Sequence, residues 1–250
     1  GPMKAIPAFD LTVQTRVLRT ELDAAWQRVT ESGHFILGQE VERFEAAVAR
    51  TLDCRFAIGL NSGTDALVIG LRALGVGPGD EVVTSPFSFF ATAEAIVTVG
   101  ATPVFADIDL ETLNVTADSI EQVLTRKTKV VLPVHLFGRP CPVQEFRQRG
   151  WGLPILEDAA QAYGTRVGTR FAGTVGDAGV LSFFPTKNLG GFGDGGMLVT
   201  DSLEVASCAR KLRSHGSEKK YFNEEVGYNS RLDAIQAAIL GVKLPHVARW

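Results

Sequence analysis

Apolar residues follow two different periods along this chain, and each period predicts a different kind of element. Apolar positions that recur every three or four residues predict a helix, and a short apolar run bounded by glycine, proline or charge predicts a buried strand. Helices are predicted at about 14–31, 39–51, 61–74, 89–100, 117–125, 142–149, 202–216 and 232–244. Strands are predicted at 55–60, 81–85, 102–108, 129–136, 153–159, 178–184 and 195–200.

Strands and helices therefore alternate through most of the chain. This order predicts an α/β fold, in which a mostly parallel sheet is covered by helices on both faces. The chain has 250 residues, of which 45% are hydrophobic, and this is enough for one large domain with a sizeable core. Because ligands of such sheets bind beyond the carboxyl ends of the strands, residues at those ends are the first candidates for a functional site.

Charge and cysteine content argue against several classes of partner. The formal net charge is −3, and no run of basic residues favours nucleic acid or an anionic membrane surface. No apolar stretch is long enough to predict a transmembrane helix, and no secretory signal is visible. Three scattered cysteines without CxxC spacing are typical of reduced thiols in a cytoplasmic protein, and four dispersed histidines give no metal-ligand spacing.

The most informative stretch is LSFFPTKNLGGFGDGGMLVT, residues 181–200. Lys187 lies there between an apolar run and a glycine-rich tract, where an ammonium is costly unless it is neutralised or bonded. A lysine in this setting can act as a Schiff-base nucleophile toward a carbonyl, and pyridoxal 5'-phosphate (PLP) is the common carbonyl cofactor. The alternative is a lysine that extends from a loop into solvent.

NSGTDAL, residues 61–67, marks the passage from a strand into a helix. Free backbone N–H groups and the helix dipole make such a position an anion site. The hydroxyls of Ser62 and Thr64 add donors, and Gly63 allows close approach of the backbone. The alternative is a plain helix cap by Ser62 or Thr64. The segment lacks the GxGxxG spacing of a dinucleotide-binding loop.

LEDAAQAYG, residues 156–164, places Asp158 at the end of an apolar strand. A carboxylate there can keep a pyridinium nitrogen protonated, which makes the ring an electron sink. Gln161 follows at helical spacing and could meet the same ring. The alternative for Asp158 is a capped turn. Glu157 is the competing carboxylate, and strand alternation predicts that it points to the opposite face.

An aromatic cluster and a serine complete the candidate chemistry. Phe87, Phe89 and Phe90 follow a strand end, where an aromatic ring could stack on a planar cofactor, although at least one of them is expected in the core. Ser182 lies five residues before Lys187 on the strand that leads into its loop, and could donate to the same phosphate. The alternative for Ser182 is a buried strand serine bonded to backbone.

Together these segments resemble the DegT/DnrJ/EryC1/StrS family of PLP-dependent sugar aminotransferases, of the fold-type I, aspartate aminotransferase-like superfamily. The resemblance covers nearly the whole chain, in FILGQEVERFE, NSGTDAL, GVGPGDEVVTSPFSFFATAEAI, ATPVFADID, PVHLFGRP, PILEDAAQAYG, SFFPTKNLGGFGDGG and YNSRLDAIQAAIL. It implies a mostly parallel sheet of the seven-stranded type within a large PLP-binding domain of residues 31–250. An N-terminal segment and helix would occupy residues 1–30, and a small C-terminal domain is expected beyond residue 250.

The resemblance also implies a role for each matching residue. The implied cofactor residues are the Schiff-base lysine Lys187, the pyridinium partner Asp158, Gln161 beside the ring, Phe89 stacked on it, and Gly63, Thr64 and Ser182 at the phosphate, with Ser62 beside them. Asn229 corresponds to an asparagine that reaches the phosphate of the neighbouring subunit, which implies a homodimer with shared sites. Arg231 is a further candidate for a carboxylate or phosphate of the substrate. The apolar stripe of helix 232–244 is expected at or near the two-fold interface, the alternative being its own core.

The implied activity is transfer of an amino group from an amino acid, glutamate in the family, to a keto group of a nucleotide-linked sugar. Lys187 would move the proton between the donor's α-carbon and the cofactor. NSRLD, with GSEKKY before it, is more similar to relatives acting on 3-keto sugars than on 4-keto sugars. PLP-dependent dehydration or epimerisation and a catalytically silent regulator are the alternatives. Lys187 favours transamination, because relatives that dehydrate sugars carry histidine there.

Overall fold

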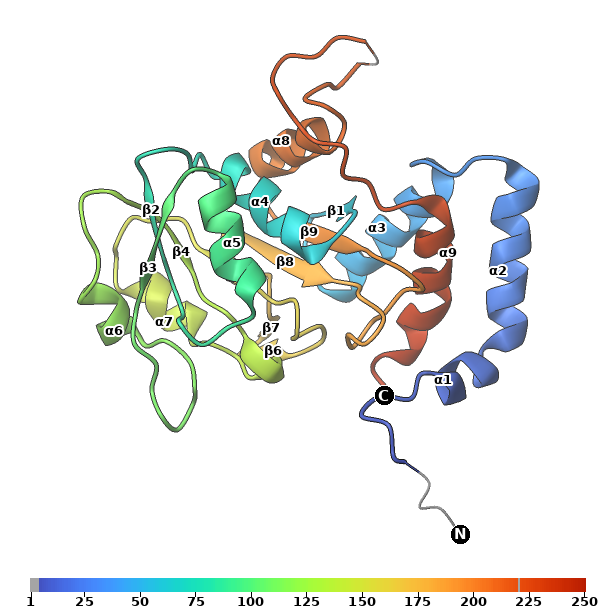
Figure 1. Cartoon of the computed structure of the whole chain (residues 1–250), viewed down its shortest axis with the longest axis horizontal. Coiled ribbons are helices and arrows are strands. Elements are labelled where there is room, and N and C mark those ends of the chain that lie inside the picture. The colour runs from blue at the N-terminus through green and yellow to red at the C-terminus, as the bar shows by residue number, and fades with distance from the viewer. Residues whose placement is uncertain (1–4, 220) are drawn as a thin grey trace.

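A seven-stranded sheet forms the centre of the protein in the computed structural model, which describes residues 5–219 and 221–250 (Figure 1). Two groups of strands, β3-β2-β4 and β5-β8-β9-β1, meet where Val131 pairs with Ile155 and Val134 pairs with Asp158. Strand β9 runs antiparallel to both β8 and β1, and the other neighbours are parallel. The strands are β1 (Phe56–Leu60), β2 (Glu81–Thr84), β3 (Thr102–Phe105), β4 (Thr128–Leu132), β5 (Leu156–Asp158), β8 (Ala178–Ser182) and β9 (Gly196–Thr200).

Helices cover both faces of this sheet, as the alternating pattern predicts. Helices α4, α5 and α8 pack on one face, and α3, α6, α7 and α9 pack on the other, with α2 outside α9 (Figure 1). The helices are α1 (Thr12–Val17), α2 (Arg19–Ser32), α3 (Gln39–Thr51), α4 (Gly63–Ala73), α5 (Phe90–Thr98), α6 (Ala117–Glu121), α7 (Val143–Gln148), α8 (Leu203–Arg213) and α9 (Ala234–Lys243).

Residues of the strands alternate between the two cores. In β8, Val180 faces the core under α4 and α8, whereas Leu181 faces the core under α3 and α9. In β2, Val82 and Val83 divide in the same way. These strands read as continuous apolar runs because both of their faces are covered. The carboxyl ends of the parallel strands are left as the edge at which polar side chains can gather.

The apolar stripe of α9 is covered by this chain, so the alternative that it packs on the chain's own core is confirmed. Ala238 and Ile239 are buried, and Ile235 and Val242 are half-buried against them. The covering residues lie on α2 and just before it, and include Leu22 and others of that helix. A wide stripe was expected to need a second chain, but the buried residues Leu22, Ala25 and Val29 of α2 cover it instead.

Differences in the remaining elements are small. The helix predicted at 14–31 is divided at Leu18, whose side chain is 3% exposed and packs beside Ile239. Two short strands, β6 (Arg166–Val167) and β7 (Arg170–Phe171), were not predicted and form an antiparallel hairpin after β5. No helix in the described part of the chain is long and apolar enough to cross a membrane.

Candidate active site

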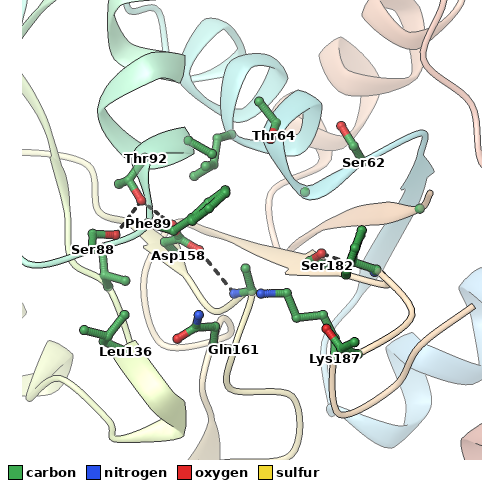
Figure 2. Close-up of a pocket in the computed structure, with 18 of the residues that line it drawn as sticks. Ser62, Thr64, Ser88, Phe89, Thr92, Leu136, Asp158, Gln161, Ser182 and Lys187 are labelled. Atoms are coloured by element: carbon green, nitrogen blue, oxygen red, sulfur yellow. Dashed lines mark hydrogen bonds between the residues drawn. The ribbon is translucent and has the colours of Figure 1, made fainter. Parts of the chain in front are cut away.

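A cavity of about 390 Å³ lies where β5 and β8 end and where α4 and α5 begin (Figure 2). Its walls come from segments far apart in the sequence, as expected at the carboxyl edge of a parallel sheet. Most of the predicted site residues meet here. Those that line the cavity are Ser62, Gly63, Thr64, Phe89, Asp158, Gln161, Ser182 and Lys187.

Lys187 lies in the loop that joins β8 to β9, and its side chain extends across the cavity toward Asp158 (Figure 2). A tight turn begins the loop, since the Lys187 N–H donates to the carbonyl oxygen of Phe184 at 2.9 Å. The lysine therefore points inward, and the alternative of a solvent-directed side chain is wrong. Burial lowers the pKa of the Lys187 amine, and the nearby Asp158 carboxylate opposes that shift. Because its pKa is lowered, a larger fraction of the Lys187 amine is neutral at physiological pH than for a solvated lysine.

Asp158 ends β5, and its side chain is buried beneath the cavity. Oδ2 accepts a hydrogen bond from Thr92 Oγ1 at 2.9 Å, and Oδ1 accepts one from the Ala160 N–H at 3.2 Å. Burial raises the pKa of the Asp158 carboxyl, while Thr92, Ala160 and the more distant His135 and Lys187 oppose the rise. The Ala160 bond is the turn cap that the sequence allowed, so the cap and the cavity-facing carboxylate occur together.

Thr92 and Ser88 belong to this site, although the motifs did not single them out. Ser88 Oγ lies 2.7 Å from Thr92 Oγ1, and both residues line the cavity. Because the single hydroxyl proton of Thr92 goes to Asp158, Ser88 is the donor in the bond between the two hydroxyls. Two hydroxyls in series thus lead to the carboxylate. The available signal was that Ser88 comes just before a predicted helix whose first turn contains Thr92, so both hydroxyls lie near the helix start.

Glu157, the competing carboxylate, points to the opposite face of β5, as predicted. It accepts hydrogen bonds from the N–H groups of Gly173, Val175 and Gly176 and lies 2.8 Å from His135 Nε2. His135 Nδ1 accepts from the Cys141 N–H, so the ring proton is on Nε2 and is donated to Glu157. Both carboxylate oxygens of Glu157 therefore accept hydrogen bonds from the backbone or from His135, and Glu157 holds loops together.

The N-terminus of α4 forms a narrow cradle beside β8. Ser62 caps the helix, since its Oγ accepts from the Asp65 N–H at 3.0 Å. The preceding backbone N–H groups of Gly63 and Thr64 belong to the first helical turn, whose donors have no partner within the helix. A Cβ on Gly63 would lie 2.9 Å from Ser182 Cβ, so only glycine lets the helix end approach the strand this closely. Ser182 Oγ accepts from the Phe184 N–H at 3.4 Å and stays beside the cradle. An anion is the ligand that this arrangement favours.

Gln161 and Phe89 occupy other walls of the cavity. Gln161 Oε1 accepts from the Phe137 N–H at 2.8 Å, which leaves the amide N–H₂ group as its remaining donor. Phe89 precedes α5 and is 70% exposed, and Phe87 and Phe90 are exposed as well. The expectation that one of the three belongs to the core is therefore wrong. Their shared position at the strand-to-helix passage keeps them at the rim, and only Phe89 lines the cavity.

Asn229 and Arg231 lie outside this cavity. Asn229 is exposed and forms an isolated antiparallel bridge with Ser214. Arg231 lines a separate hollow of about 910 Å³, whose other walls include His215 and Arg213. Within this chain, neither residue reaches the cradle of α4.

Comparison with known proteins indicates the same family as the sequence motifs do. Residues 17–250 match the sequence model of the DegT/DnrJ/EryC1/StrS aminotransferase family. The chain is 46% identical to the pleiotropic regulatory protein of Geobacillus stearothermophilus, over 98% of this chain and 66% of that protein. It is 45% identical to the UDP-N-acetyl-3-dehydro-α-D-glucosamine 3-aminotransferase of Acidithiobacillus ferrooxidans, over 98% of this chain and 67% of that protein.

The fold also matches solved structures. The crystal structure of DesV from S. venezuelae, in complex with a ketimine intermediate, aligns with a TM-score of 0.94 and 44% identity. The alignment covers 98% of this chain and 67% of DesV. This likeness confirms the predicted α/β fold of fold type I. The chain spans about two thirds of the length of these proteins.

Proposed function

Since the chain belongs to the DegT/DnrJ/EryC1/StrS aminotransferase family, we propose that it is the large domain of a PLP-dependent sugar aminotransferase. The protein would transfer an amino group from an amino acid, L-glutamate by resemblance, to a keto group of a nucleotide-linked sugar. One observation carries the proposal: Lys187 extends across a cavity toward the buried Asp158, beside a helix N-terminus built for an anion.

The side chains of the cavity fit the cofactor of this family. The cradle of Gly63, Thr64 and Ser182 suits its phosphate, because a Cβ on Gly63 would fill the space. Asp158 would face the pyridine nitrogen and Lys187 the aldehyde carbon, which is supported by their positions on opposite sides of one cavity. Phe89 would lie against the ring. When bound, PLP supplies a ring that withdraws electrons from the substrate's α-carbon.

The remaining work falls to residues of this chain. Asp158, whose ionised form accepts hydrogen bonds from Thr92 and the Ala160 N–H, would hold a proton on the ring nitrogen. The Lys187 amine would take the proton from the α-carbon of the donor and deliver it to the cofactor, and its lowered pKa is suited to this exchange. The depth of the cavity would keep water away from this exchange.

The substrate is proposed at the level of a 3-keto sugar on a nucleotide. The NSRLD motif supports this assignment, and the relative from A. ferrooxidans is named for a 3-dehydro sugar and its 3-amination. Because small pocket contacts decide between carbon 3 and carbon 4, a 4-keto sugar is the competing substrate. A panel of 3-keto and 4-keto sugar nucleotides with glutamate, read by mass spectrometry, separates them. Product formed without an amino donor would instead indicate dehydration.

A homodimer with shared sites completes the proposal. Asn229, exposed and outside its own cavity, would reach the cofactor phosphate of a second chain, and Arg231 would bind an anionic group of the substrate. Residues 31–250 would form the PLP-binding domain, with a smaller C-terminal domain beyond residue 250. A cytoplasmic location is proposed because the three cysteines are free, as is typical of reduced thiols.

The decisive test of this function is covalent. Protein loaded with PLP is expected to absorb in the visible, and borohydride is expected to fix the cofactor on Lys187. Lys187→Ala is expected to abolish both signals. Trapping at another lysine would overturn the assignment.

A silent regulator is the second candidate, favoured by the name of the Geobacillus relative. The position of Lys187, facing Asp158 across the cavity, argues against a regulator. A regulator has no need for an amine that carries protons or for a carboxylate that keeps the cofactor ring protonated. Amino transfer from glutamate to bound PLP separates the two. A chain that binds PLP at Lys187 but transfers no amino group from any common amino acid would favour the regulator.

A further inference from the structure

Lys243, in the last turn of α9, is a buried lysine that the proposed reaction does not use. It is 1% exposed. Its Nζ donates to the carbonyl oxygen of Gly190 at 2.7 Å and lies 4.6 Å from the centre of the Phe192 ring. Burial lowers the pKa of this amine, and no carboxylate in the described part of the chain offsets the shift. Burying an ammonium group costs free energy of folding, and its contact with the Gly190 carbonyl oxygen offsets that cost.

Gly190 belongs to the loop that carries Lys187. Gly190 follows Lys187 after two intervening residues, of which Leu189 is buried in the core. Gly190 is itself buried, and a buried carbonyl requires a donor. Among the hydrogen bonds of residues 5–219 and 221–250, Lys243 supplies that donor.

Helix α9 holds the same loop at a second point. Gln236 Oε1 accepts from the Phe192 N–H at 2.7 Å. Gln236 precedes Lys243 by seven residues, which is two helical turns, so both side chains leave the same face of α9. The two contacts fix the stretch from Gly190 to Phe192 along that face.

Close packing connects these contacts to the turn at Phe184–Lys187, which begins the Lys187 loop. A Cβ on Gly190 would lie 2.2 Å from the Pro185 carbonyl oxygen, and a Cβ on Gly191 would lie 2.7 Å from Gln236 Oε1. The glycine tract, here Gly190 and Gly191, therefore packs closely between α9 and the turn that begins the Lys187 loop. A shift of Gly190 cannot be absorbed there and must move the turn.

We propose that Lys243 and Gln236 are positioning residues, which hold the glycine tract and through it keep the Lys187 amine in place for the cofactor. The inference rests on the proposed function of Lys187. A displacement of a fraction of an ångström in a reacting group is costly to catalysis and binding, so a second support behind Lys187 is physically warranted. The Gly191 N–H donates to the Phe183 carbonyl oxygen at 2.8 Å, whereas the Gly190 carbonyl oxygen and the Phe192 N–H depend on Lys243 and Gln236.

The test compares variants that remove each donor or acceptor. Lys243→Met keeps the length of the side chain and loses the donor, and Gln236→Leu loses the acceptor for Phe192. Both are expected to weaken PLP binding about tenfold and to lower the fraction that borohydride fixes on Lys187. Gln236→Glu keeps an acceptor oxygen and is expected to bind PLP as the wild type does. PLP affinity is measured by titration of the visible absorbance, below the unfolding temperature of each variant.

Ile239→Ala is the matched control, because Ile239 lies on α9 but packs against Leu22 of α2. It is expected to lower the unfolding temperature and leave PLP affinity close to the wild-type value. The proposal is overturned if Lys243→Met and Gln236→Leu bind and trap PLP as the wild type does, or if Ile239→Ala weakens PLP binding equally. Should Lys243→Met not fold, the two Gln236 variants decide. Failure of the function itself looks different, since the wild-type chain would then not trap PLP on Lys187.

Discussion

Replacing Thr92 with valine is the sharpest test of how a hydroxyl offsets the burial of the Asp158 carboxylate. Thr92 is 1% exposed and Asp158 is 5% exposed, so solvent screens the bond between them little. A hydrogen bond to a charged group contributes about 1.5–3 kcal/mol, and each 1.36 kcal/mol corresponds to a factor of ten. Thr92→Val is therefore expected to slow amino transfer from glutamate to bound PLP by about 10- to 100-fold.

The pH dependence distinguishes this cause from a general loss of structure. Thr92 lowers the pKa of Asp158, so its removal raises that pKa further. A neutral Asp158 cannot hold a pyridinium proton, whereas higher pH restores its charge. The acidic limb of the rate profile is thus expected to move to higher pH in Thr92→Val, with partial recovery of the rate above it.

Three control variants accompany this experiment. Thr92→Ser keeps the hydroxyl and is expected to retain most of the rate, and Ser88→Ala removes only the second hydroxyl and is expected to fall between. Thr98→Val makes the same substitution on the same helix, where the exposed hydroxyl donates to the Glu94 carbonyl oxygen, and should change nothing. A wild-type pH profile in Thr92→Val, with PLP on Lys187, would refute the argument.

Three further predictions follow from the site. Asp158→Asn should leave PLP bound but slow amino transfer by orders of magnitude. Because burial raises the pKa of Asp158 above 3.8, its charged carboxylate lowers the stability of the folded protein as pH rises through the raised value. Urea unfolding of the PLP-free protein should therefore show Asp158→Asn to be more stable than wild type at pH 7 but not below pH 3.8. Gly63→Ala should weaken PLP binding, because its Cβ would meet Ser182, and unchanged affinity by absorbance titration would contradict the cradle. Mixed Lys187→Ala and Asn229→Ala chains should regain activity if sites are shared, whereas a monomer by light scattering, or no recovery after confirmed exchange, would exclude sharing.

Local pattern was enough to predict most elements, although several end two to four residues before the predicted residue. Helix α3 begins and ends at the predicted residues, because its apolar positions Val41, Phe44 and Val48 recur at helical spacing. Asp158 and Ser182 end β5 and β8, and Gly63 begins α4. Since the ends of parallel strands meet at one edge, predicting the strands amounted to predicting the cavity.

Features that depend on packing between distant segments were not predictable. The stripe of α9 would look the same whether α2 or a second chain covered it, and only the fold shows that α2 does. The phenylalanines after β2 are as apolar as core residues, yet all three are exposed. Thr92 is an ordinary helical threonine in sequence, and its importance arises from a carboxylate 66 residues away.

The two neighbouring carboxylates of β5 show what separates a structural acid from a functional one. Both are buried, and strand alternation sends them to opposite faces. Glu157 meets three backbone N–H groups and His135, so its oxygens have no capacity left for a ligand. Asp158 receives one donor on each oxygen and still borders a cavity, so an acceptor position remains on the side of the cavity. Burial raises its pKa, so its ionised form is left under-stabilised until a cation arrives, and a protonated ring nitrogen facing it would supply that charge. The carboxylate that the fold leaves incompletely satisfied is therefore the one assigned to the chemistry.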